Sequence, residues 1–322
     1  MINSKGYRIL ITDPKVQEIK KELTVCPFIP CNKYPIKTPM YRVSDKYLYM
    51  PKYFGLKKLG VPDVVSEQNG ISVNFTFNGK LRDYQVPECN KILKELVRND
   101  SCLASLYTGW GKTCGAIWAI SQLKIKTIII VHKDALLEQW AKQIQSFLGI
   151  KCSIIKGKVI DTSGDIVIGM IQSISMKEYP KDTFRDFGLC IYDEVHHTPS
   201  KVFSSVFYKI GAKKNLGLSA TIKRSDGLSH VIEWFLGNII VNIKQVTTVP
   251  KIELIEYYPE KLPDDKLMVN GKINIPAMIN GLCSDFTRTD LVVSKTRELY
   301  SFGRKILILS DRRGHCEEII GK

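Results

Sequence analysis

The chain has 322 residues, of which 44% are hydrophobic and 25% are charged, and its formal net charge is +15 at pH 7. This composition is ordinary for a globular protein, and the length suffices for two or three domains. Neither an apolar run approaching about eighteen residues nor a signal-peptide core occurs, so the expectation is an intracellular, soluble protein without a membrane segment.

The positive charge is concentrated in the first three quarters of the chain. Residues 1–80 carry 13 Lys/Arg and 6 Asp/Glu, residues 81–245 carry 22 and 15, and residues 246–322 carry 12 and 11. Such an excess indicates either a polyanionic partner such as nucleic acid or a generally basic surface. The nine cysteines form no C-x-x-C pair, and Cys26 and Cys31 lack a second pair for zinc, so free thiols are expected.

Residues 1–80 predict a small, basic α+β accessory domain. Strand-like patterns occupy residues 8–12 and 71–77, and residues 33–55 interleave tyrosines with lysines. This interleaving suits a nucleic-acid surface, where rings stack on bases and lysines hold phosphates. It equally suits a mixed domain that buries its tyrosine rings.

Residues 81–245 predict a doubly wound α/β domain with a mostly parallel sheet, because apolar runs alternate with amphipathic stretches. The expected strands are Cys102–Tyr107, Thr127–His132, Cys152–Ile155, Asp165–Met170, Leu189–Tyr192 and Asn215–Ser219. The expected helices are Thr113–Leu123, one capped by Asp134 with an apolar side from Leu136 to Phe147, Ser200–Ile210 and Leu228–Leu236.

Residues 246–322 predict a linker and the opening of a second α/β domain. A connecting strand is expected at residues 251–259, a helix over Asp285–Tyr300, a buried strand at 304–310 and the start of a helix from 311.

A candidate phosphate loop follows the first strand of the α/β domain. Thr108-Gly109-Trp110-Gly111-Lys112-Thr113 leads into a helix, so backbone N–H groups and a helix N-terminus can face phosphate oxygens. Lys112 can reach the β- and γ-phosphates, and Thr113 can bind Mg²⁺. Leu106 stands where the phosphate-loop pattern has its first glycine.

Two acidic residues follow another buried strand. Placing the carboxylates of Asp193 and Glu194 at the end of a buried strand costs free energy, which indicates a functional role. Binding of a divalent ion that faces a nucleotide would be such a role. Ser219-Ala220-Thr221 ends a third strand, where hydroxyl groups suit a hydrogen-bonded hinge or a simple turn.

In this order, the motifs resemble those of superfamily 2 helicases and translocases. LRDYQ (81–85) resembles the Q motif, TGWGKT (108–113) motif I, VHKDALLEQW (131–140) motif Ia, GMIQSI (169–174) motif Ib, DEVH (193–196) motif II and SAT (219–221) motif III. KRSDGL (223–228) is similar to the segment after motif III in the XPB branch, and residues 305–319 are similar to motif IV. The basic, tyrosine-rich front end resembles helicases of large cytoplasmic DNA viruses.

The resemblance implies two RecA-like domains, the second incomplete, together with ATP, Mg²⁺ and a role for most of the motif residues. Gln85 and Arg82 would read adenine, and Thr108, Gly109, Trp110, Gly111 and Lys112 would hold phosphates. Thr113 and Asp193 would hold Mg²⁺, and Glu194 would be the catalytic base. His196, Ser219 and Thr221 would couple hydrolysis to motion.

The resemblance also implies nucleic acid as partner, the transcription machinery as a further candidate, and the host cytoplasm or the virion as location. Motifs V and VI, which supply an arginine finger in this family, do not occur in the sequence, so a truncated chain with slow ATP hydrolysis is expected. Two alternatives stay open: a nucleic-acid-binding scaffold with a vestigial ATPase, and a double-stranded DNA translocase that never separates strands.

Overall fold

The computed structural model describes residues 1–28, 36–197, 200–221, 226–244, 251–258, 268–269 and 272–322. It divides the chain into two compact units, Met1–Val246 and Thr247–Lys322. Residues 1–80 lie within the first unit together with the α/β segment that follows them.

An eight-stranded sheet forms the centre of the first unit, in the order β11-β10-β12-β9-β13-β14-β8-β15. Every neighbouring pair is parallel except β10 and β11, which confirms the predicted α/β class with a mostly parallel sheet. The strands are β8 Ser101–Leu106, β9 Thr127–Val131, β10 Ser153–Lys156, β11 Val159–Ile160, β12 Ile166–Met170, β13 Leu189–Tyr192, β14 Lys214–Ser219 and β15 Ile239–Ile243.

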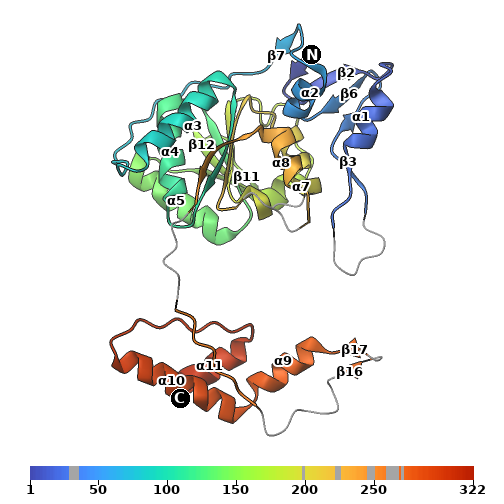
Figure 1. Ribbon diagram of the computed structural model, residues 1–322. Coiled ribbons are helices and arrows are strands. Elements are labelled where there is room, and N and C mark those ends of the chain that lie inside the picture. Colours follow the sequence, from blue (N-terminus) through green and yellow to red (C-terminus); the bar gives the residue numbers. More distant parts are fainter. Residues whose placement is uncertain (29–35, 198–199, 222–225, 245–250, 259–267, 270–271) are drawn as a thin grey trace. The chain divides into compact units, whose positions relative to one another are not determined.

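Helices cover both faces of this sheet (Figure 1). The helices on one face are α3 Val86–Arg98, α4 Lys112–Leu123 and α5 Asp134–Leu148, and those on the other are α6 Ile171–Met176, α7 Ser200–Ile210 and α8 Ser229–Leu236. Successive strand residues enter different cores: Ile128 and Ile130 join one buried cluster, and Ile129 and Val131 join the other. This two-sided burial explains why the strands are apolar throughout rather than alternating.

The start of α5 differs from the prediction. Lys133, not Asp134, occupies the cap position, and no side chain caps the helix. The Asp134 carboxylate instead lies 2.9 Å from Lys156 Nζ on β10. A competing ion pair therefore takes the carboxylate that the sequence assigns to capping. The predicted apolar side is confirmed, because Leu137, Trp140 and Ile144 are buried.

The N-terminal residues form a second, smaller sheet with the order β5-β6-β2-β1-β7. The helices and strands of this part of the chain are β1 Ile2–Asn3, β2 Gly6–Leu10, α1 Val16–Glu22, β3 Thr24–Val25, β4 Thr38–Pro39, β5 Arg42–Val43, β6 Tyr47–Met50, α2 Lys52–Leu59 and β7 Val65–Ser66. β3 and β4 pair with each other, apart from the five-stranded sheet. The strand expected at residues 71–77 is wrong, since only an isolated bridge from Ser72 to Ile125 forms there. Instead, the Val73 N–H donates to the Lys124 carbonyl at the end of α4 at 3.0 Å, and Phe75 is buried.

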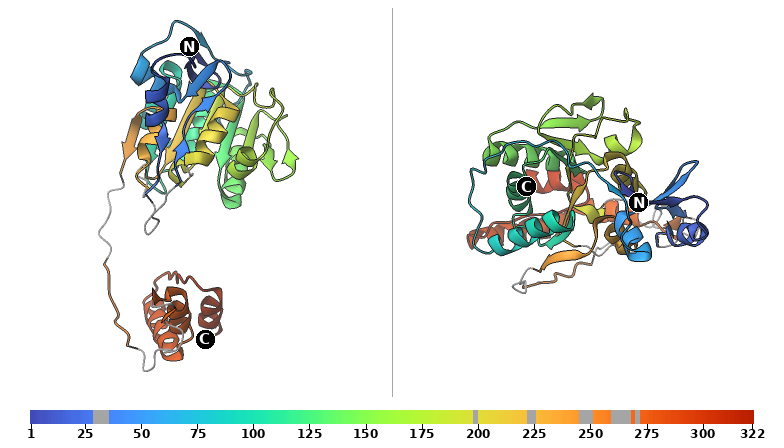
Figure 2. Two further views of the ribbon diagram at one scale, coloured as in Figure 1. Left: turned by 90° about the vertical axis from the view of Figure 1, so that its right-hand side faces the viewer. Right: turned by 90° about the horizontal axis from the view of Figure 1, so that it is seen from above.

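The N-terminal part packs against α7 and α8, as Figures 1 and 2 show for the blue segment. Phe54 on α2 meets Trp234 on α8 edge to face, with ring centroids 5.4 Å apart. Tyr208 on α7 donates a hydrogen bond of 3.0 Å to the carbonyl of Met40. The two parts therefore share one continuous core.

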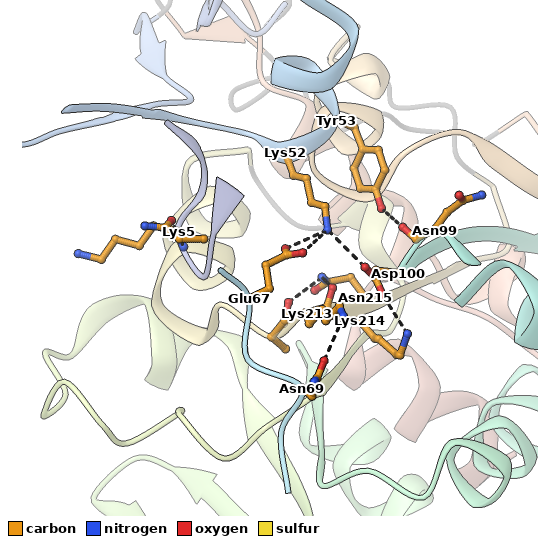
Figure 3. A network of polar contacts seen from close by, with 12 residues as sticks. Lys5, Lys52, Tyr53, Glu67, Asn69, Asn99, Asp100, Lys213, Lys214 and Asn215 are labelled. Atoms are coloured by element: carbon orange, nitrogen blue, oxygen red, sulfur yellow. Dashed lines mark hydrogen bonds and ion pairs between the residues drawn. The ribbon is translucent and has the colours of Figure 1, made fainter. Parts of the chain in front are cut away.

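A buried chain of charges adds a polar connection at the start of β8 (Figure 3). Lys52 Nζ on α2 lies 2.8 Å from Glu67 and 3.7 Å from Asp100. Asp100 also pairs with Lys214 Nζ, the first residue of β14, at 2.8 Å. Since Asp100 directly precedes β8, this network fixes the N-terminal part to two central strands.

The second unit contains β16 Met268–Val269, β17 Lys272–Ile273, α9 Ile275–Cys283, α10 Phe286–Ser301 and α11 Arg313–Gly321. The helix expected over Asp285–Tyr300 is confirmed, and the Asp285 side chain caps it by accepting a hydrogen bond from the Arg288 N–H. The helix expected from residue 311 begins at Arg313.

Two predicted strands of the second unit are wrong. Residues 251–258 and 304–310 run without strand pairing, and Pro259 lies outside the described residues. Leu307 and Leu309 are 81% and 84% exposed. An apolar run becomes a strand only beside a partner strand and under a covering layer, and the described part of this unit supplies neither for 304–310. Across the described ranges, no helix has both the length and the apolar character needed to cross a membrane.

Candidate nucleotide site

The sheet order brings the three candidate motifs together. β13, β14 and β8 are neighbours, and their carboxyl ends lead into Asp193, into Ala220 and into the loop that precedes Lys112. Parallel strands end at one edge of a sheet, which is where α/β folds bind ligands. The site residues therefore converge although more than 100 residues separate the first motif from the last.

The phosphate loop depends on two left-handed glycines. Gly109 and Gly111 have φ of 89° and 95°, and Lys112 is the first residue of α4. A Cβ on Gly111 would lie 2.5 Å from Gln85 Nε2, whereas one on Gly109 would meet nothing within 4 Å. Leu106 is the fully buried last residue of β8, so the turn begins only after it. The first glycine of the pattern is dispensable here because its position belongs to the strand.

The Gln85 side chain holds this loop. Gln85 is buried; its Nε2 donates to the Trp110 carbonyl at 2.8 Å, and its Oε1 accepts from the Arg82 N–H at 2.9 Å. The Tyr84 hydroxyl donates to the same Trp110 carbonyl at 3.3 Å. Both polar ends of the Gln85 amide are thus engaged with protein, and the exposed Arg82 side chain donates to Tyr84 at 2.8 Å.

Lys112 and Glu194 form the central contact of the site. Lys112 Nζ lies 2.5 Å from Glu194 Oε1, and both side chains are largely buried. Glu194 Oε2 is buried without a hydrogen-bond partner, 3.5 Å from His196 Nδ1. Burial opposes ionisation of Glu194, but the hydrogen bond and the charge of Lys112 outweigh it, so the pKa of Glu194 lies below its ordinary value.

Asp193 is held by a tryptophan of α5. Trp140 Nε1 donates to Asp193 Oδ2 at 2.8 Å, and the Glu194 N–H donates to Oδ1 at 3.0 Å. Burial raises the pKa of Asp193 even so. Because burial destabilises the charged form of Asp193, a cation placed beside this carboxylate is expected to stabilise it.

His196, Ser219 and Thr221 form a hydrogen-bonded chain behind the acids. Ser219 Oγ lies 2.6 Å from His196 Nδ1, donates to the Thr221 carbonyl and accepts from the Thr221 N–H at 3.2 Å. The ends of β13 and β14 are thereby linked through side chains.

The remaining predicted residues lie around this centre. Thr108 and Gly109 are exposed at the loop, and Thr113 is buried at the start of α4. The Trp110 indole is buried in the core, which leaves only its backbone for a ligand. Residues 223–225, part of the motif proposed after Thr221, lie outside the described residues.

The oxygen atoms at this site suit a magnesium ion shared with a nucleotide better than a metal ion that is bound by protein side chains alone. In the described parts of the chain, no three His, Cys, Asp or Glu side chains cluster as a metal site. Mg²⁺ is usually bound through one or two protein oxygens, waters and substrate phosphates. The Thr113 hydroxyl and the Asp193 carboxylate match this demand, and the unpartnered oxygen of Glu194 fits a water beside them.

Two functional neighbours were missed in the sequence. Trp140 was predicted as part of an apolar helix side and of the segment that resembles motif Ia, but without a polar contact, although a buried indole N–H needs an acceptor, which was a usable signal. Tyr84 lies inside the LRDYQ motif, but nothing in the sequence indicated that its hydroxyl would reach Trp110.

Known proteins share this arrangement in sequence. Residues 78–224 match the family model described as the res subunit of type III restriction enzymes. A candidate ATP-dependent RNA helicase of Acanthamoeba polyphaga mimivirus is 34% identical over 323 residues, covering 95% of this chain and 62% of the relative. A candidate helicase of Invertebrate iridescent virus 6 is 28% identical over 290 residues, covering 87% of this chain and 64% of the relative.

The chain therefore spans less than two thirds of the length of either relative. Among solved structures, the UvsW helicase of bacteriophage T4 gives a TM-score of 0.49 at 16% identity, covering 70% of this chain and 93% of that one. The family match spans every residue of the site, from Arg82 to Thr221.

Proposed function

We propose that this chain, whose residues 78–224 match the family model described as the res subunit of type III restriction enzymes, is the ATP-hydrolysing part of a superfamily 2 nucleic-acid helicase or translocase. The observation that carries the proposal is the Lys112–Glu194 contact of 2.5 Å at the shared edge of β8 and β13. A phosphate-binding lysine and a water-activating carboxylate meet there over a glycine loop.

Each residue then has a chemical task. The amides around Gly109 and Gly111 hold the β- and γ-phosphates, and Lys112 leaves Glu194 to neutralise them. The freed Glu194 carboxylate orients the attacking water and accepts its proton. Thr113 and Asp193 would hold Mg²⁺, which would offset the charge that develops on the leaving phosphate.

The coupling chain follows from the same geometry. Glu194 Oε2 lies 3.5 Å from His196, which contacts Ser219. A change at the γ-phosphate is therefore expected to shift the end of β14 and Thr221. Gln85 and Arg82 are proposed to contact adenine, and Gln85 also fixes the loop through Trp110.

Several finer assignments belong to the proposal. The DEVH sequence at 193–196 supports the XPB-like branch, and through it a partner in transcription. The viral relatives support a viral origin, with work in the host cytoplasm or the virion. Residues 1–80 are proposed as an accessory domain, 81–245 as the first RecA-like domain and 246–322 as the linker and opening of the second.

Replacing Glu194 with Gln tests the proposal. We expect ATP turnover to fall by roughly 10²–10⁴-fold, because the general base is lost, while binding of a fluorescent ATP analogue persists. Glu138→Gln, an exposed acid on α5, is the matched control and should leave turnover unchanged.

The same assays separate the alternatives. DNA or RNA should stimulate turnover in the unaltered protein but not in Glu194→Gln. Strand binding without any turnover would favour the scaffold. Displacement of a triplex without strand separation would favour a double-stranded DNA translocase.

A further inference from the structure

One face of the N-terminal sheet presents aromatic and basic side chains in register. On β6, Leu48 and Met50 are buried, whereas the alternating Tyr47 and Tyr49 are half-buried on the opposite side, and Tyr49 also packs against the edge of the core. Arg8 on β2 and Arg42 on β5 both lie opposite Tyr49. Since residues directly opposite in a sheet share a face, Arg42, Tyr49 and Arg8 form a row across three strands.

The neighbouring pair of residues on β2 and β6 extends this surface. Leu10, which is 56% exposed, lies opposite Tyr47. The rings of Tyr47 and Tyr49 are 6.2 Å apart and tilted by 60°. Together, Arg8, Leu10, Arg42, Tyr47 and Tyr49 define the outer sheet face, which lies away from the helix α2 that packs on β2.

A cation lies over one face of each ring. The Arg8 guanidinium lies 4.4 Å from the centroid of Tyr47, and Lys5 Nζ lies 5.6 Å from that of Tyr49. The Arg42 guanidinium lies 5.9 Å from the Tyr208 ring, at the border with α7. These distances fit cation–π contacts, which by themselves give a sheet surface only about 0.5–1 kcal/mol each.

The positive charges of this face have no acidic partner among the residues that the structure describes. Within the described residues, no carboxylate forms an ion pair with Lys5, Arg8 or Arg42. Arg8 Nε instead donates to the sulfur of Met1 at 2.9 Å, which is a weak acceptor. A phosphate oxygen would be a better partner for this guanidinium than the thioether.

From this arrangement we infer that the outer sheet face binds single-stranded nucleic acid. Unpaired bases stack on Tyr47 and Tyr49, and Lys5, Arg8 and Arg42 hold the flanking phosphates. The bases of a duplex are already stacked on one another, so the half-buried rings of Tyr47 and Tyr49 offer them little. The inference rests on the proposed function only in taking a nucleic acid as the partner.

Oligonucleotide binding to the full chain tests this assignment. Fluorescence anisotropy would use labelled oligo-dT and oligo-U of roughly 15 nucleotides, with a duplex of equal length beside them. We expect Tyr47→Leu/Tyr49→Leu to weaken single-strand binding by about tenfold or more, since each stacked base is worth roughly 1–3 kcal/mol. Tyr47→Phe/Tyr49→Phe keeps both rings and should retain the affinity.

The charge variants give an independent readout. Arg8→Gln and Arg42→Gln should each lower the salt dependence of binding by about one ion. Lys21→Gln, an equally charged change on α1 outside the sheet, should alter the slope less. If the double Leu variant does not fold, as judged by its unfolding midpoint, the arginine variants decide.

Unchanged affinity in the Leu variant together with unchanged salt slopes in the arginine variants would overturn the inference. So would stronger binding to the duplex than to either single strand. The ratio of oligo-dT to oligo-U affinity identifies the natural strand, and either preference supports the assignment. Binding of the ATP analogue is measured in parallel: its loss with strand binding intact contradicts the proposed function alone, and the converse contradicts this inference alone.

Discussion

At the residue scale, the conformation of the candidate phosphate loop depends on which of its positions have no room for a Cβ atom. Leu106 occupies a glycine position at no cost because it is still part of β8. Gly111 cannot be replaced in the same way, since its φ of 95° and the nearby Gln85 amide both exclude a Cβ. The conformation of each residue, not the pattern alone, decides which glycine matters.

Gly111→Ala should therefore weaken nucleotide binding more than Gly109→Ala. Both changes strain a left-handed residue by roughly 1–2 kcal/mol, but only the first also pushes Gln85 Nε2, 2.5 Å from the new Cβ, off the Trp110 carbonyl. Titration with a fluorescent ATP analogue measures the difference. Equal affinities in the two variants would show that the contact between Gln85 and the loop is unimportant.

The meeting of the 108–113, 193–196 and 219–221 segments was predictable because each follows an apolar strand, and the strand ends of a parallel sheet converge. What the sequence could not supply were contacts between distant elements. The bond from Trp140 to Asp193 joins residues 53 positions apart, and the bond from Gln85 to Trp110 joins residues 25 apart. Such pairs depend on how α5 and α3 lie over the sheet, which periodicity does not encode.

At the element scale, prediction succeeded where both faces of a strand are buried. β9, β12 and β13 read as short apolar runs, and the structure places them within a residue of the expected bounds. β15 was missed because it lies at the sheet edge, where Ile239 and Ile240 are partly exposed. Residues 304–310 read as the same kind of run, yet form no strand, because hydrophobicity cannot reveal whether a partner strand is present.

The buried charges of α2 offer a test at this scale. Lys52→Met should destabilise the first unit by about 3–5 kcal/mol, because it leaves Glu67, whose side chain is 7% exposed, without its cation. Urea unfolding measures the loss. Lys58→Met is the matched control: its partners Glu18 and Glu22 are 59% and 41% exposed, so the loss should be far smaller. Similar losses would refute the structural role of the Lys52 network.

At the scale of the whole molecule, the chain holds two units with different internal connections. The N-terminal sheet and the eight-stranded sheet share a core and the Lys52–Asp100–Lys214 chain. The second unit, from Thr247 onward, has its own packing of α9, α10 and α11. Each unit should therefore open as a separate cooperative body.

Native-state hydrogen exchange with rising denaturant should detect these two bodies. Amides of β2 and β8 are expected to open together, while those of α10 open independently. Lys52→Met should lower the opening free energy of the first group and leave α10 unchanged. Release of β2 at a lower free energy than β8 would show that the N-terminal part is instead a separately folding module.

The ion pair between Lys112 and Glu194 has a consequence for the ATP hydrolysis proposed above. Because the ammonium has an anionic partner within the protein, ATP binding would exchange one ionic partner for another instead of satisfying a bare charge. The same exchange runs backward as ADP and phosphate depart. Because the Glu194 carboxylate competes with ADP and phosphate for Lys112, it would favour release of these products and so the start of the next turnover.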